Sequence, residues 1–135
     1  MLSVQELTNS GLVLKSEKIK RAVLTALADS EMVKILDAAM YQSKSVIQIL
    51  RETGVSHSTA YRKIKWLVEE RLLIIDKTEI TQDGRKFSLF RTILKSFNVK
   101  YEYNKVVMEA DQNPDTIRKI PENFFSLSER EAFNK

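Results

Sequence analysis

The stretch SVIQILRETGVSHSTAYRKIKWLVEERLL, residues 45–73, constrains the fold most, because it holds two segments with the apolar spacing of helices, joined by a tight turn. The first covers residues 45–53, and Gly54 follows it where a left-handed backbone costs least. Val55 is an apolar residue within the turn. Ser56 is a suitable N-cap for the second helix, since its hydroxyl can accept from an unpaired backbone N–H. Four apolar residues of the second segment are expected to point inward: Ala60, Ile64, Leu67 and Val68.

The outer face of the second segment is polar and partly basic. It carries His57, Ser58, Thr59, Tyr61, Arg62 and Lys65. A short helix, a turn that contains glycine and a second helix with such a face are typical of a helix-turn-helix. Residues 72–94 then predict a strand, a turn at Asp83-Gly84 flanked by Arg85 and Lys86, and a second strand. The predicted fold class is therefore α+β: a winged helix-turn-helix, with helices packed on a small antiparallel β-wing.

Two further helices are predicted before this stretch. Ser16 is expected to cap a helix over residues 17–28. Its apolar stripe is Ile19, Val23, Leu24 and Leu27. Asp29 and Ser30 interrupt this helix and cap the next, which covers residues 31–41. Lys44 and its neighbours then lie where winged helices carry a short first strand.

The chain continues beyond the wing with a second β-hairpin. Val99, Tyr101 and Tyr103 alternate with polar residues, and Asn104-Lys105 supplies a turn. The pattern predicts a long wing strand that runs into this hairpin, with one face buried on the domain or against another chain. A strand is favoured over residues 88–97, although the spacing of Ile93, Leu94 and Phe97 also fits a helix from Phe90 to Phe97.

The predicted organisation has three parts. Residues 1–15 form an N-terminal extension, residues 16–97 form the winged helix-turn-helix domain, and residues 98–135 form the hairpin extension with an aromatic tail. The tail contains Phe124, Phe125, Leu127 and Phe133, and a capping-box pattern at Ser128 and Glu131. These apolar residues either dock on their own domain or form a surface for a second copy or a protein partner.

The positive charge of the chain is concentrated in two places. The net charge is only +4, but residues 56–66 contain three bases and no acid. Residues 77–100 contain six bases and two acids, a local balance of +4. These segments are the predicted second helix of the helix-turn-helix and the wing, so the charge pattern favours nucleic acid as the partner.

The order of elements resembles the ArsR-type winged-helix transcription regulators. The resemblance covers about residues 20–92 and is carried by ALADSEMVKILDAAM, which leads into the helix-turn-helix, and by STAYRKIKWLVEERLL. With DGRKFSLFR, the sequence looks most like small archaeal regulators of this type. The resemblance implies a homodimer that binds double-stranded DNA to regulate transcription. Family members that sense metals use cysteine clusters, which this chain lacks, so that role is not implied here.

The expected DNA contacts follow from the docking geometry of a helix-turn-helix. The recognition helix, residues 56–72, is expected to lie in the major groove, and the wing, residues 76–88, on the minor groove or the backbone. The candidate base contacts are His57, Ser58, Thr59, Tyr61 and Arg62. The candidate phosphate and wing contacts are Lys44, Lys63, Lys65, Arg85 and Lys86. Arg62 is the best base reader, because its guanidinium can donate to both O6 and N7 of guanine.

Composition argues against other classes of function. The absence of cysteine excludes disulfides, thiolate catalysis and most zinc sites, and His57 is the only histidine. No phosphate-binding glycine loop or Ser–His–Asp motif is present, so we predict no enzyme, no metal and no cofactor. No apolar run is long enough to span a bilayer, and the N-terminus has no secretory pattern. We expect a cytoplasmic, nucleoid-associated protein.

Two classes of function remain. The first is a sequence-specific DNA-binding transcription regulator that acts as a homodimer. The second is a winged-helix protein-interaction module, such as a subunit of a transcription complex, which works through the hairpin and the aromatic tail. A fold of this kind does not decide between them.

Overall fold

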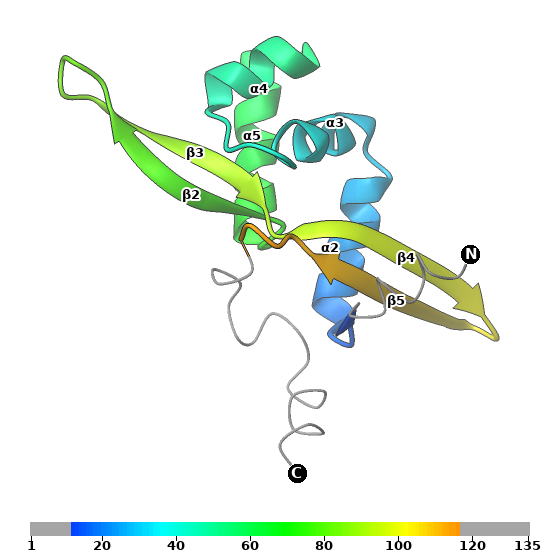
Figure 1. Ribbon diagram of the computed structural model, residues 1–135. Helices are drawn as coiled ribbons and strands as arrows, with labels where there is room; N and C mark the ends of the chain where they lie inside the picture. Colours follow the sequence, from blue (N-terminus) through cyan, green and yellow to red (C-terminus); the bar gives the residue numbers. More distant parts are fainter. Residues whose placement is uncertain (1–11, 117–135) are drawn as a thin grey trace, which may run out of the picture.

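The computed structural model describes residues 12–116, which form an α+β structure with helices and two antiparallel sheets (Figure 1). The helices are α2 (Glu17–Leu27), α3 (Ser30–Ala38), α4 (Val46–Thr53) and α5 (His57–Glu69). The strands are β1 (Leu12–Val13), β2 (Leu73–Ile80), β3 (Lys86–Thr92), β4 (Leu94–Glu102) and β5 (Lys105–Gln112). The predicted aromatic tail and its capping box lie outside the described residues.

Side-chain caps begin three of the helices, and those of α2 and α3 are the ones that the sequence predicts. The Ser16 hydroxyl accepts from the Ile19 N–H at 3.3 Å, and the Asp29 carboxylate accepts from the N–H groups of the first turn of α3. Ser45 and Gln48 form a capping box at α4, which satisfies two backbone donors at once. Ser56 is the N-cap of α5, but its side chain makes no capping hydrogen bond, so the predicted role of its hydroxyl is wrong.

The tight turn between α4 and α5 is confirmed. Gly54 has φ +75°, and its N–H donates to the Leu50 carbonyl at 2.9 Å, which ends α4. Val55 is buried in the turn. The inward residues of α5 are also confirmed: Ala60, Ile64 and Leu67 are buried, and Val68 packs on the core while half-buried. The helix ends at Glu69, three residues earlier than the predicted limit of residue 72.

The first hairpin follows α5 directly. β2 and β3 pair antiparallel from Leu73 with Thr92 to Ile80 with Lys86, and the register shifts between Ile75 and Lys77. Lys44 forms an isolated antiparallel bridge with Phe90, which is the short first strand expected from the sequence. This arrangement of helices and hairpin is compatible with a winged helix.

The second hairpin differs from the prediction in how it begins. Residues 88–97 are extended, as favoured, but β3 and β4 belong to different sheets and are separated at Ile93. The predicted long wing strand is therefore interrupted, and the predicted boundary between residues 97 and 98 falls within β4. The turn that joins β4 to β5 contains Tyr103 and Asn104, whose φ values are +52° and +62°.

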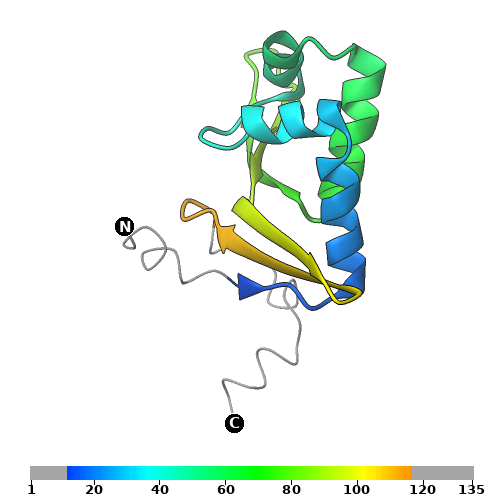
Figure 2. The same cartoon turned by 90° about the vertical axis from the view of Figure 1, so that its right-hand side faces the viewer.

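The second sheet has the order β1-β5-β4 (Figure 2). The segment before residue 16, predicted as an extension, thus contributes a strand. Leu14 is fully buried and packs with Met108 and Ala110 of β5 in the apolar core, to which residues of the helices also contribute. Two apolar expectations are wrong: Leu24 and Leu27 of α2 are exposed, because Ala22 and Ala26 face the core instead.

A buried polar cluster fixes the corner at which the chain passes from one sheet to the other. The Asn113 amide donates to the carbonyls of Met40 and Thr92, each at 3.1 Å. The Thr116 hydroxyl donates to the Thr92 carbonyl at 2.9 Å, and the Asn113 N–H donates to the Ile93 carbonyl at 2.8 Å. These bonds connect the end of β5, the end of β3 and the loop after α3.

Replacing Asn113 with alanine is expected to lower the free energy of unfolding by about 1–3 kcal/mol, because buried carbonyls lose a donor. Urea denaturation followed by circular dichroism measures the change. Asn98→Ala on β4 is the control, since Asn98 is exposed, and its effect is expected to stay within about 0.5 kcal/mol. Equal stability of the two variants would contradict a structural role for Asn113.

Candidate nucleic-acid interface

The outward face of α5 carries a row of polar and basic side chains. Ser58, Arg62 and Lys65 are all exposed, and their spacing of four and three residues places them on one side of the helix. Ala60, Ile64 and Leu67 are buried on the opposite side and hold α5 against the core. The row can therefore contact a partner without any rearrangement of the helix.

The other predicted base contacts lie to either side of this row. The rings of His57 and Tyr61 are stacked, with centroids 6.4 Å apart and planes inclined by 4°. Both residues are exposed, whereas Thr59 is half-buried on the opposite flank. His57 and Tyr61 therefore present a pair of parallel, exposed aromatic rings on the same flank of α5.

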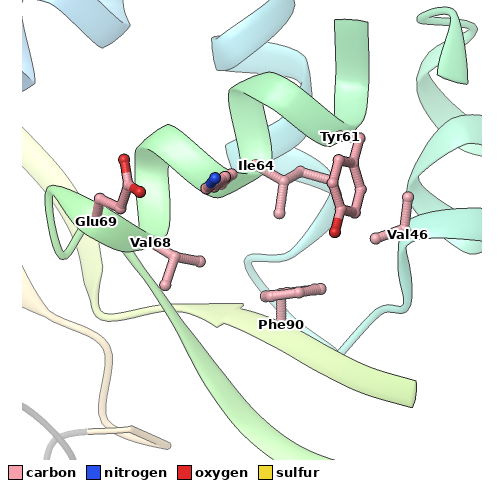
Figure 3. Close-up of a pocket in the computed structure, with 7 residues that line it drawn as sticks. Val46, Tyr61, Ile64, Val68, Glu69 and Phe90 are labelled. Carbon is pink, nitrogen blue, oxygen red and sulfur yellow. The ribbon is translucent and has the colours of Figure 1, made fainter. Parts of the chain in front are cut away.

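A small cavity lies beneath Tyr61, between α5 and β3 (Figure 3). It has a volume of about 190 Å³, and its walls are largely apolar. The lining residues are Val46, Tyr61, Ile64, Lys65, Val68, Glu69 and Phe90. Sequence reasoning did not predict this cavity, because Val46 and Phe90 come from other elements and are joined to α5 only in the folded chain.

Lys63, predicted as a phosphate contact, is instead largely buried and paired with two carboxylates within the fold. Its ammonium lies 2.5 Å from the Asp29 carboxylate and 2.9 Å from that of Glu31, and only 11% of the side chain is exposed. The hydrogen bond that Lys63 donates to Asp29 holds the pKa of Asp29 below its ordinary value, and the same bond raises the pKa of Lys63. Lys63 therefore joins α5 to the start of α3.

Lys44, also predicted as a phosphate contact, is likewise paired within the fold. Its ammonium donates to both oxygens of the Glu52 carboxylate, at 2.7 and 2.8 Å, and to the Ala38 carbonyl at 3.0 Å. Only 14% of its side chain is exposed. Lys44 thus neutralises an acid of α4 and satisfies a carbonyl at the end of α3.

The tip of the first hairpin presents the two predicted basic residues. Arg85 and Lys86 are exposed, and the loop between the strands is closed by Thr81, whose hydroxyl accepts from the Arg85 N–H at 3.1 Å. The Thr81 hydroxyl also donates to Asp83, and this bond holds the pKa of the Asp83 carboxyl below its ordinary value. The Asp83 carboxylate lies 3.6 Å from the Arg85 guanidinium. Among the described residues, Lys86 at the same tip forms no ion pair.

A polar groove on the other side of the hairpin was not anticipated. It runs between α4 and the strands β2 and β3, with a volume of about 660 Å³. Arg51 of α4 and Lys77 of β2 line it and add basic groups, while Asp76 and Glu79 add acidic ones. Arg91, counted among the wing bases, is buried and donates to the Met40 carbonyl and to the Asp115 carboxylate.

Residues 12–116 hold no cluster of three or more His, Cys, Asp or Glu side chains that could bind a metal ion. Across the same part of the chain, no helix has the length and apolarity needed to cross a membrane.

Lys63→Met is expected to lower the free energy of unfolding by about 1–2 kcal/mol at neutral pH, since Asp29 and Glu31 lose their counter-ion. The Asp29 part of this contribution is complete above its ordinary pKa of 3.8 and is lost as the pH falls through the lowered pKa of the folded state. Urea denaturation across a pH series measures both effects. Lys65→Met, on the exposed face, is the matched control, and a loss as large as that of Lys63→Met would contradict the assignment.

Comparisons of the chain with protein-family models, with curated proteins and with solved structures find no match. The function proposed for it therefore depends on the arrangement of the exposed residues of α5 and the first hairpin.

Proposed function

We propose that this protein is a winged helix-turn-helix transcription regulator that binds double-stranded DNA at specific sequences. The observation that carries the proposal is the exposed row Ser58, Arg62 and Lys65 on the second helix of a two-helix unit with a tight turn. An α-helix with its side chains fits into the major groove of B-form DNA. The order of the helices and the first hairpin is compatible with the same assignment.

The contact roles follow from exposure and chemistry. Arg62 reads guanine through two donors, and Ser58 contacts a base or a phosphate near the start of α5. Lys65 and Lys86 contribute charge to phosphate contacts, which give affinity without sequence preference. The first hairpin projects beside α4 and α5, so Arg85 and Lys86 extend the basic surface beyond the helix (Figure 1).

A protein-interaction module is the second candidate. It is favoured by exposed apolar residues of the second hairpin, Val99, Tyr101 and Tyr103. Salt separates the two candidates, because each phosphate contact releases a counterion and makes affinity fall as salt rises. An aromatic protein interface has no such dependence.

Arg62→Ala is expected to weaken binding to the selected site by about 1–3 kcal/mol and to relax preference at one base pair. Lys86→Ala is expected to weaken all sequences alike and to reduce the slope of log affinity against log salt by about one. Selection from random duplexes at two salt concentrations, followed by titration of the recovered site, measures both variants.

Lys105→Ala is the control for these variants. Lys105 is an exposed base at the turn of the second hairpin, at the opposite end of the molecule from the first hairpin (Figure 1). Its removal changes the net charge as the other variants do, but affinity and salt slope should stay as in the parent. Equal weakening by all three variants would indicate binding through overall charge and would contradict the proposed surface.

A further inference from the structure

We propose that the outer edge of β4 pairs with β4 of a second copy of the chain, antiparallel and centred on Val99. The two three-stranded sheets would then form one continuous sheet across a two-fold axis. This inference concerns the contact between copies and does not depend on DNA binding.

The first observation is an edge with main-chain groups directed outward. β5 lies between β1 and β4, and no described strand pairs with the outer side of β4. The Met108 carbonyl accepts from the Leu14 N–H at 2.8 Å, so Met108 directs its main-chain groups towards β1. Because these groups alternate along a strand, every second residue of β5 counted from Met108 does the same. The remaining residues of β5 face β4, where Val107 pairs with Lys100 and Glu109 pairs with Asn98.

The alternation of β4 then fixes which groups are free. Since Asn98 and Lys100 direct their N–H and C=O groups towards β5, the intervening residues direct theirs to the outer edge. These residues are Phe97, Val99 and Tyr101. Each of them can exchange a pair of hydrogen bonds with a strand placed alongside.

The second observation is an apolar face that continues to this edge. Val99 is opposite Met108 and Tyr101 is opposite Val106, so their side chains share the face on which Met108 is fully buried. Yet Val99 is 40% exposed and Tyr101 is 71% exposed. The buried face of the sheet therefore ends in apolar side chains that the described residues do not cover.

The other strand edges are less suited to pairing. β1 has only two residues. β2 has a register shift between Ile75 and Lys77, and an irregularity of this kind bends and twists a strand away from a partner. β4 has its irregularity between Leu94 and Ser96, which leaves the pairing regular from Ser96 to Glu102.

The midpoint of this regular segment is Val99, which sets the register of the proposed pair. Val99 lies opposite Val99 of the second copy, and Phe97 lies opposite its Tyr101, which gives about six main-chain hydrogen bonds. On the other face Lys100 lies opposite Asn98, and its charge is balanced within the chain by Glu102 at 3.0 Å. A register centred on Lys100 would instead place two ammonium groups directly opposite each other.

Because the chain has no cysteine, single cysteine variants report the contact directly. Val99→Cys is expected to form a disulfide-linked dimer under mild oxidation, since Cα atoms of a hydrogen-bonded antiparallel pair are about 5.5 Å apart, within the range of disulfides. Val107→Cys is the matched control, because Val107 is 41% exposed but lies on β5, in the middle of the sheet. Equal cross-linking of the two variants, or no cross-linking of Val99→Cys, would overturn the proposal.

Val99→Pro tests the hydrogen bonds. A proline is tolerated where the N–H points away from the sheet, so the monomer should fold, as circular dichroism can verify. In sedimentation equilibrium without DNA, the parent should have twice the chain mass. The variant should raise the dimer dissociation constant by about tenfold or more, because both central donors are lost. A monomeric parent, or a variant that dimerises as the parent does, would overturn the proposed edge contact and leave the DNA proposal to its own binding measurements.

Discussion

The fold depends on the hydrogen bonds around the carbonyls of Met40 and Thr92. Two strands end there, and a loop from α3 arrives at the same point, so each buried carbonyl needs a donor from a distant part of the chain. The Asn113 amide donates to both carbonyls. Arg91 donates a further hydrogen bond to the Met40 carbonyl, and Thr116 donates one to the Thr92 carbonyl. Because buried polar groups cost free energy when unpaired, these contacts determine the position of the second sheet relative to the helices.

The helix α5 illustrates how one element separates a structural role from a proposed binding role. Lys63 is directed towards the start of α3 and is paired with two carboxylates, while its neighbours Arg62 and Lys65 face solvent. The rotation of 100° per residue accounts for this difference. Charge on α5 is therefore divided between an internal ion pair that orients the helix and an exposed row that can meet a partner.

Local patterns in the sequence predicted the caps at Ser16 and Asp29, the glycine turn, the first hairpin and the extended character of residues 88–97. They did not predict the break at Ile93, because the residues on both sides favour strands and only the packing of two sheets separates them. The ion pairs of Lys44 and Lys63 were not predicted for a related reason. Whether a lysine is exposed or paired depends on acids of other elements that the fold brings beside it, as Asp29 is brought to Lys63 and Glu52 to Lys44.

The single residue between β3 and β4 has a mechanical consequence. Ile93 is fully buried, and no flexible linker separates the two hairpins, which extend in different directions from this point (Figure 1). A change in the angle between the hairpins would therefore have to displace the buried Ile93 side chain and break the hydrogen bonds of Asn113 and Thr116 at this corner.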